Sequence, residues 1–141
     1  SEIAKRWVNK GGVVVVVGSE KEVEIGVEIK KINGNKIVNL CGKTTLIETL
    51  ILMKKCSIAL TNDSGPMHMA AAVELPLVAV FSARDFPVFW YPTGSGSTIL
   101  RKLVVCSPCL AESCFNDNLC LKKITIDEVW SKIEGHYVTT H

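Results

Sequence analysis

The sequence predicts an α/β protein built on an open, doubly wound parallel sheet. Short runs rich in β-branched residues alternate along the chain with longer stretches of helical periodicity, and capping residues or glycines separate them. Hydrophobic residues make up 48% of the chain, yet every apolar run falls short of the roughly 20 residues that a bilayer span needs. Strands that alternate with helices pair in parallel and are joined by right-handed crossovers.

Size and charge limit the classes of protein that remain. The 141 residues match one ordinary domain, so we expect a single domain over residues 1–141. A net charge of +2 gives no reason to expect a nucleic-acid partner or an electrostatic attraction to a membrane surface. Because no basic, apolar leader opens the sequence, the expected location is the cytoplasm.

The first segments predict one helix, one strand and a second helix. Residues 1–12 have the pattern of the second half of an amphipathic helix that ends at two glycines, so we expect further sequence upstream. Val13–Val17 is typical of a strand buried on both faces. Ser19 is the expected N-cap of a helix that ends at Asn33–Gly34.

The same strand and helix unit then repeats. Lys36–Leu40 predicts a second strand, and residues 44–56 a helix with Thr44 or Thr45 as its cap. The remaining predicted elements are a strand at Ser57–Thr61, a helix at Pro66–Glu74 and a strand at Leu77–Phe81.

The regular pattern stops at Ser82. Residues 82–98 predict a loop rich in aromatic residues, proline and glycine, and residues 99–105 are assigned to no element. The loop contains four aromatic residues, Phe86, Phe89, Trp90 and Tyr91. We expect these rings to pack beneath the following cysteine segment rather than to line a cleft. Residues 124–138 predict a closing helix with Thr125 or Asp127 as its cap.

The junction between the third strand and its helix carries the strongest candidate site, which consists of Asn62, Asp63, Ser64, Gly65 and His68. Ligands of such sheets bind beyond the carboxyl ends of the strands, and helix N-termini bind phosphate through unpaired amides. Gly65 permits close approach of a ligand, and His68 lies in the first helical turn. Asp63 would repel a phosphate, so it is better suited to accept hydrogen bonds from hydroxyl groups attached to that phosphate.

A simpler interpretation of this junction is equally well supported by local chemistry. Asn62 or Asp63 is then only the N-cap of a tight turn, and His68 is a surface residue.

Three catalytic or nucleotide-binding motifs are excluded by the sequence. The stretch ending in Gly42-Lys43-Thr44 lacks the first glycine of a P-loop, since position 37 is Ile. Neither Gly-x-Ser-x-Gly nor Gly-x-Gly-x-x-Gly occurs, which argues against a serine hydrolase and a dinucleotide dehydrogenase.

Four of the six cysteines form a cluster in a loop at residues 106–120, namely Cys106, Cys109, Cys114 and Cys120. The Cys-x2-Cys opening is usual for structural zinc, but the second pair has a less typical spacing. Structural zinc, disulfides and reduced thiols therefore all remain open, although a cytoplasmic location disfavours disulfides. In each case we expect the cluster to be structural.

The stretch "CGKTTLIETLILMKKCSIALTNDSGPMHMAAAVELPLVAVF", followed by "WYPTG" and "CSPC", resembles glycosyltransferase family 9, the bacterial lipopolysaccharide heptosyltransferases. The resemblance implies a GT-B enzyme, which has two Rossmann-like domains and an active site between them. The chain looks like the C-terminal, donor-binding domain. The N-terminal acceptor domain, which carries the catalytic base, is then absent, and the chain alone is expected to be inactive.

The resemblance also implies roles for individual residues. Asp63 would bind the donor sugar, Ser64 and Gly65 would offer amides to the diphosphate, and His68 would contact a phosphate. Asn39 to Thr44 would flank the nucleoside.

The activity implied is inverting, metal-independent transfer of a heptose-like sugar from a nucleoside diphosphate, expected to be ADP. The acceptor would be a lipopolysaccharide-core glycolipid at the inner membrane surface. Two alternatives remain open: a non-catalytic nucleotide-binding module that acts through a partner, and a small interaction domain stabilised by its cysteines.

Overall fold

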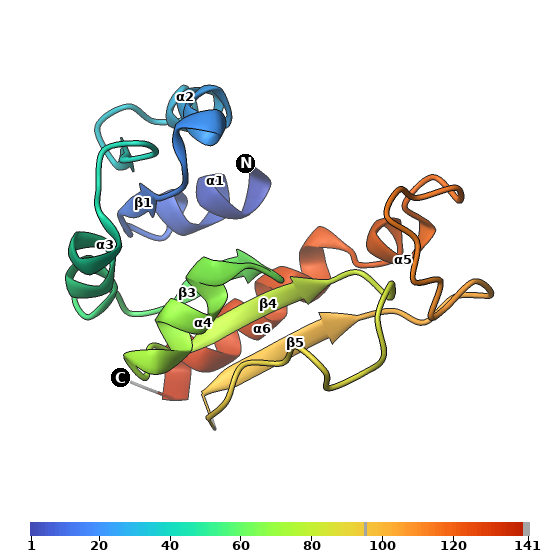
Figure 1. Ribbon diagram of the computed structural model, residues 1–141. Coiled ribbons are helices and arrows are strands. Elements are labelled where there is room, and N and C mark those ends of the chain that lie inside the picture. The colour runs from blue at the N-terminus through green and yellow to red at the C-terminus, as the bar shows by residue number, and fades with distance from the viewer. Residues whose placement is uncertain (95, 140–141) are drawn as a thin grey trace. The chain divides into compact units, whose positions relative to one another are not determined.

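The computed structural model describes residues 1–94 and 96–139, and it divides into two compact units, Ser1–Leu52 and the chain from Met53 onward. Both units have parallel strands flanked by helices (Figure 1), which confirms the predicted α/β class. Ser95, within the predicted aromatic loop, lies outside the described residues. The part of the chain that the structure describes contains no helix long and apolar enough to cross a membrane.

The first unit contains a two-stranded parallel sheet with helices around it. Register pairs Val14 with Ile37 and Val16 with Asn39. Its core includes Val8, Ile37 and Cys41, all buried. In chain order its elements are α1 (Glu2–Asn9), β1 (Val14–Val16), η1 (Glu20–Glu22), α2 (Val23–Lys30), β2 (Ile37–Asn39) and α3 (Leu46–Met53), whose last residue falls in the second unit.

The second unit contains a three-stranded parallel sheet in the order β3-β4-β5. The register pairs Asn62 with Val80 and Phe81 with Arg101, so the carboxyl ends of the three strands lie at one edge. Its elements are β3 (Ala59–Asn62), α4 (Gly65–Ala72), β4 (Leu77–Phe81), β5 (Ser97–Arg101), α5 (Leu119–Lys122) and α6 (Ile126–Thr139).

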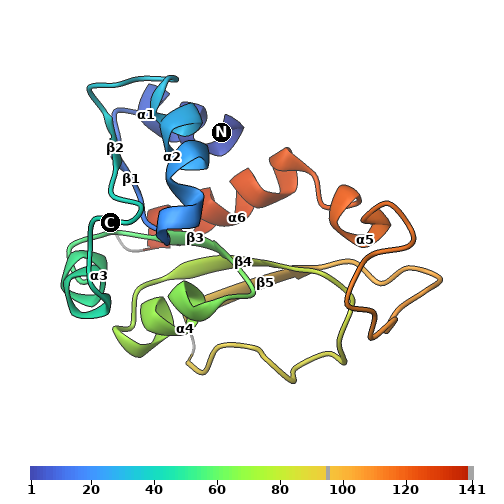
Figure 2. The same cartoon turned by 45° about the horizontal axis from the view of Figure 1, so that its top comes forward.

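Strand β4 is the centre of this second core. Its consecutive residues Leu77, Val78 and Ala79 are all fully buried, which requires cover on both faces because successive side chains of a strand point to opposite sides. Both α4 and α6 contact β4, and they lie on opposite sides of the sheet (Figure 2). The prediction of a doubly wound layer is therefore confirmed for this unit.

Two predicted helix starts are confirmed by hydrogen bonds between the cap residue and a glutamate three residues later. Glu22 accepts hydrogen bonds from the backbone N–H of Ser19 at 2.7 Å and from its hydroxyl at 2.9 Å. Thr45 rather than Thr44 caps α3, because Thr45 makes the same reciprocal pair of bonds with Glu48. Each pair closes a capping box around otherwise unpaired amides.

The last helix and the last strand show where prediction succeeded and failed. Thr125 caps α6 by accepting from the N–H of Glu128 at 3.1 Å, which settles the choice between Thr125 and Asp127. Strand β5 was not predicted, because its apolar residues follow a Gly and Ser-rich stretch and lead directly into Arg101 and Lys102.

Candidate functional site

The junction predicted from sequence lies at the carboxyl edge of the second sheet. Strand β3 ends at Asn62, Asp63 follows, and Ser64 occupies the N-cap position of α4 in an extended conformation. Asn62, Asp63, Ser64, Gly65 and His68 are all exposed. The interpretation that Asn62 or Asp63 caps the helix is wrong, because the cap position belongs to Ser64.

The first turn of α4 keeps its donors available. The Ser64 side chain makes no capping hydrogen bond and donates instead to the Asn62 carbonyl at 3.3 Å. The Met67 N–H bonds the Ser64 carbonyl at 3.0 Å, whereas no acceptor among the described residues pairs with the Gly65 N–H. Unpaired amides at a helix N-terminus attract anions.

Gly65 has no packing reason to be glycine in the structure. A Cβ atom added there would meet nothing within 4 Å, and the backbone is not in the left-handed region. Glycine also costs up to about 1 kcal/mol relative to alanine inside a helix. The open space above Gly65 is consistent with a ligand that approaches the backbone closely.

Charged side chains from three segments influence Asp63. Its pKa is raised, first by partial desolvation and second by the negative charge of Asp85, while His68, Arg101 and Arg84 act in the opposite direction. These residues follow β3 or β4, end β5, or lie at the start of α4, so the carboxyl edge gathers two carboxylates, two guanidinium groups and one imidazole. Such an edge can bind an anion and, through Asp63, accept hydrogen bonds from hydroxyl groups.

Arg84, Asp85 and Arg101 were missed by the sequence analysis. The Arg101 Nη2 donates to the Asp85 carbonyl, and Arg84 Nε lies 3.9 Å from Asp85 Oδ2. The available signal was positional: Arg84 and Asp85 come shortly after the predicted end of β4, where ligands of parallel sheets bind. Arg101 could not be placed in this way because β5 was not recognised as a strand.

The cysteine segment, residues 106–120, supports the segment that carries Arg84. The Leu110 N–H donates to the Arg84 carbonyl at 3.0 Å, and the Ala83 N–H donates to Cys120 Sγ at 3.4 Å. Figure 1 shows this orange segment beyond the carboxyl ends of β4 and β5. It therefore contributes to the architecture of the candidate site, as expected for a structural element.

The structure does not support the structural zinc considered for this segment. Within residues 1–94 and 96–139, no three His, Cys, Asp or Glu side chains are arranged to hold a metal ion. The cysteines Cys106, Cys109, Cys114 and Cys120 are free thiols. Two of them accept local hydrogen bonds: Cys114 Sγ from the Asn118 N–H at 3.2 Å, and Cys106 Sγ from Asn116 Nδ2 at 3.6 Å.

The aromatic loop behaves differently from the prediction that it packs under the cysteine segment. Phe86, Phe89 and Trp90 are exposed, with Phe89 exposing 72% of its surface. Only Tyr91 is anchored as a core residue would be, edge-to-face against Phe81 with ring centroids 5.0 Å apart. The packing prediction is wrong for the three exposed rings.

Asn39 and Thr44, predicted to flank a nucleoside, belong to the first unit. Asn39 is buried, and both of its side-chain polar atoms have partners: Nδ2 donates to the Val23 carbonyl at 3.1 Å, and Oδ1 accepts from the Cys41 N–H at 3.0 Å. Its side chain holds the turn after β2 against α2. Because only 8% of Asn39 is exposed, little of its side chain is available to a ligand.

The Thr44 hydroxyl is in a different situation. It lies 2.9 Å from the Thr49 hydroxyl, and Thr49 Oγ1 donates its single hydrogen to the Thr45 carbonyl at 2.9 Å. Thr44 must therefore be the donor toward Thr49, which leaves its hydroxyl able only to accept from a ligand. Thr44 and Thr49 belong to the first unit, whereas Asp63 belongs to the second.

Parallel strands flanked by helices, with a helix N-terminus at the carboxyl edge of the sheet, place the chain in the class of Rossmann-like α/β proteins. The model of glycosyltransferase family 9 (heptosyltransferase) matches residues 1–120. The chain belongs to this family.

Relatives of known name support the assignment. The chain is 39% identical over 105 residues to lipopolysaccharide heptosyltransferase 2 of Salmonella typhimurium and 36% identical over 105 residues to lipooligosaccharide heptosyltransferase 2 of Haemophilus influenzae. Each match covers 72% of this chain and 30% of the relative. The chain thus spans about a third of the length of these curated relatives.

Solved structures agree with the fold. The structure of the E. coli ADP-heptose lps heptosyltransferase II matches with a TM-score of 0.80 and 30% identity, covering 99% of this chain and 40% of that one. A family 9 glycosyl transferase from Veillonella parvula matches with a TM-score of 0.83 at 22% identity, which supports the fold alone. Both are larger proteins than the chain described here.

Proposed function

We propose that the chain is the C-terminal, donor-binding half of a family 9 glycosyltransferase that transfers a heptose-like sugar from ADP to a lipopolysaccharide-core acceptor. In this proposal residues 1–141 act as one nucleotide-sugar-binding domain, and an N-terminal domain binds the acceptor. The observation that carries it is the carboxyl edge, where His68 and Arg84 act on Asp63 next to the uncapped start of α4.

Each part of the donor has a matching group at this edge. The diphosphate would lie against the first turn of α4, where the Gly65 amide and the exposed His68 side chain offer donors and positive charge. Asp63 would accept hydrogen bonds from the sugar hydroxyls, and its pKa is raised because partial desolvation and the charge of Asp85 disfavour the carboxylate in the free protein. Thr44 would accept a hydrogen bond from the nucleoside, and Asn39 would position the turn that carries it.

The proposed mechanism is direct displacement with inversion. A base from the N-terminal domain removes the proton of an acceptor hydroxyl, the oxygen attacks the anomeric carbon, and the bond to the diphosphate breaks. Negative charge that grows on the leaving ADP is stabilised by the α4 amides, His68 and Arg84, which are fixed before the reaction. This scheme requires no metal. The acceptor would be a glycolipid, so the enzyme would work in the cytoplasm at the inner membrane surface.

Calorimetric titration of the chain with ADP tests the donor site. We expect His68→Ala to weaken ADP binding by about tenfold, the size typical for loss of one hydrogen bond to a charged group. The matched control is His136→Ala, because His136 lies in α6 and bonds Thr98 instead. Equal ADP affinity in wild type and His68→Ala would remove His68 from the site.

A glycine pair tests close backbone approach with little risk to folding. Gly65→Ala adds a methyl group into open space, and the same change at Gly34 also meets nothing within 4 Å. If the diphosphate contacts the α4 backbone, Gly65→Ala weakens ADP binding while Gly34→Ala does not. Unchanged affinity in both variants would place the nucleotide elsewhere.

A further inference from the structure

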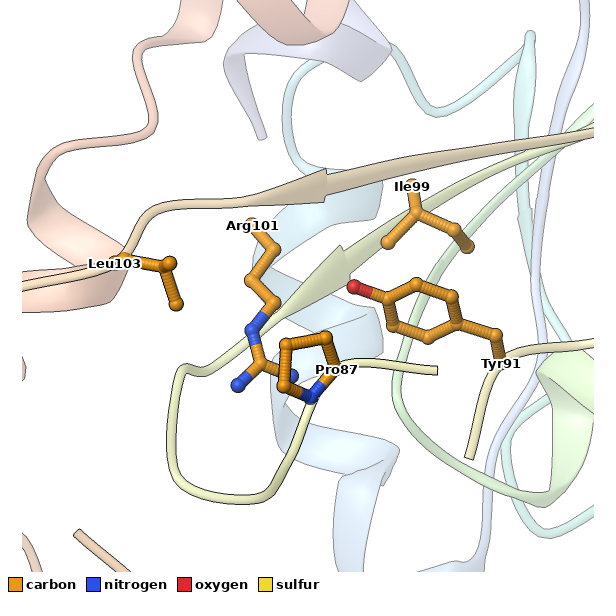
Figure 3. Close-up of a pocket in the computed structure, with 5 residues that line it drawn as sticks. All are labelled: Pro87, Tyr91, Ile99, Arg101 and Leu103. Atoms are coloured by element: carbon orange, nitrogen blue, oxygen red, sulfur yellow. The ribbon is translucent and has the colours of Figure 1, made fainter. Parts of the chain in front are cut away.

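A pocket of about 310 Å³ opens beside the candidate donor edge and has no role in the proposal so far. Its lining residues come from β5, from the segment after it and from the loop that precedes it in the chain: Pro87, Tyr91, Ile99, Arg101 and Leu103. Figure 3 shows the hydroxyl end of Tyr91 directed toward the Arg101 side chain across this pocket. The pocket combines apolar walls with two polar groups, the usual composition of a small-molecule site.

The guanidinium group of Arg101 is only partly hydrogen-bonded in the folded protein. Its Nη2 is occupied by the Asp85 carbonyl, which is neutral, whereas its Nε is buried and lacks a hydrogen-bond partner among the described residues. Among the same residues, no carboxylate lies within ion-pair distance of Arg101, because Asp85 faces Arg84 and Asp63 acts only from further away. A partly buried, unpaired charge is costly and calls for an anionic partner.

Tyr91 gives the pocket a preformed wall. Its ring packs edge-to-face on Phe81, a buried residue at the end of β4, so its position does not depend on a ligand. Pro87 and Ile99 add apolar surface around the Arg101 side chain. A flat aromatic ring beside apolar groups suits the apolar face of a sugar ring, and the phenol hydroxyl can pair with a sugar hydroxyl.

We propose that the pocket is a subsite for an anionic group, a phosphate or a carboxylate, carried on a sugar ring. Arg101 binds the anion and Tyr91 contacts the ring. The assignment of a sugar rests on the proposed function, because Asp63 lies close enough to Arg101 for the guanidinium to influence its pKa. Arg101 ends β5 whereas α4 follows β3, and β4 lies between these two strands in the sheet, so the proposed subsite adjoins the α4 diphosphate site without including the start of α4.

Glucose 6-phosphate serves as the probe, measured by ligand-observed NMR, with glucose, inorganic phosphate and ADP in parallel. We expect the chain to bind glucose 6-phosphate more tightly than glucose or phosphate alone. Arg101→Gln should weaken this binding by about tenfold, as loss of a charged hydrogen bond does. Tyr91→Phe, which keeps the contact with Phe81, should weaken it less.

Two further variants separate a pocket effect from misfolding. Leu103→Trp fills the pocket from a residue that is 65% exposed, so it should abolish glucose 6-phosphate binding and leave the fold intact. Lys102→Gln is the control, since it removes the neighbouring positive charge, which pairs with Glu128 at 2.6 Å. It should leave glucose 6-phosphate affinity within twofold of wild type.

Three results would overturn the proposal: glucose 6-phosphate binding no tighter than that of inorganic phosphate, binding unaffected by both Arg101→Gln and Leu103→Trp, or a parallel loss of ADP affinity in Arg101→Gln. The last result would assign Arg101 to the diphosphate site. Failure of the donor proposal is distinguishable, because it appears as ADP binding that is absent or insensitive to His68 and Gly65.

Discussion

Asp63, which we propose as a binding residue, carries a carboxyl group that ionises less readily in the folded chain than in the unfolded chain. A raised carboxyl pKa means that the folded chain binds the proton more tightly than the unfolded chain does. The stability that the protonated group contributes is present below the unfolded pKa, and it is lost as the pH rises through the folded value. At neutral pH the ionised Asp63 is therefore a small cost to folding.

Replacing this carboxylate should stabilise the chain. We expect Asp63→Asn to increase the free energy of unfolding at pH 7 by less than about 1 kcal/mol, since the residue is exposed. The difference should disappear near pH 3, below the unfolded Asp pKa of about 3.9, where the wild-type carboxyl group is protonated. Urea unfolding at both pH values measures it. A loss of stability at pH 7 would contradict the prediction.

Sequence reasoning identified individual residues best where local chemistry decides. The junction that carries Asp63 and His68 was located correctly between β3 and α4, because a strand end followed by a helix start is visible in the residue types, and the binding roles of the two residues stay predictions. Arg84 and Arg101 were missed because their relation to Asp63 depends on which strands are neighbours in the sheet. Neighbouring strands are a property of tertiary structure that no local pattern contains.

At the scale of elements, helix α2 packs on the end of β2 through a glycine. A Cβ atom at Gly26 would lie 2.3 Å from Asn39 Oδ1, so the helix can approach only because this position lacks a side chain. The close approach in turn lets Asn39 donate to the Val23 carbonyl. A glycine inside a helix is unfavourable by propensity, and tertiary packing explains its presence.

Two glycine substitutions with opposite expected signs test this packing. Gly26→Ala should lower the free energy of unfolding by about 1–3 kcal/mol, because overpacking displaces Asn39. Gly135→Ala, in α6, meets nothing within 4 Å and should raise stability by up to about 1 kcal/mol through helix propensity. Denaturant unfolding of both variants measures the difference. If Gly26→Ala is as stable as wild type, the contact with Asn39 does not control the packing of α2.

Helix starts were more predictable than strand ends. Ser19, Thr45 and Thr125 each carry a side chain that caps its own helix, so the signal is local. Strand β5 depends instead on the ladder that it forms with β4, from Leu77 paired with Ser97 to Phe81 paired with Arg101. Only two of its five residues, Thr98 and Ile99, are β-branched, so the local preference for a strand is weak.

At the scale of the whole chain, the alternation of strands and helices was predicted, whereas its division into two compact units was not. Periodicity shows that a segment is a strand, but it does not show where a ladder of paired strands ends. Within the described residues, β1 pairs with β2 and the remaining strands form a separate ladder. Treating residues 1–141 as one domain therefore stays a prediction.

The reactivity of two thiols, one in each unit, measures how often the buried one becomes exposed. Cys41 is 1% exposed, and burial raises the pKa of its thiol, while Cys114 is exposed. We expect Cys114 to react with an aromatic disulfide reagent at once. Cys41 should react on the order of a thousandfold more slowly, because exposing it requires opening that costs several kcal/mol.

Mass spectrometry of the labelled peptides distinguishes the two sites. The control is the same reaction in denaturant, where Cys41 and Cys114 should react at similar rates because the thiolate is equally accessible in both. Rapid labelling of Cys41 without denaturant would mean that the first unit opens readily under native conditions.

The cysteine segment holds the site loop through the main chain. The Ala83 N–H donates to Cys120 Sγ, and the Arg84 carbonyl accepts from the Leu110 N–H. Because both bonds use main-chain groups of the loop after β4, they do not depend on the side chains of Arg84 and Asp85. Under the proposed function, a change of these two side chains would alter the groups offered to a donor sugar while the main-chain attachment to the cysteine segment stays the same.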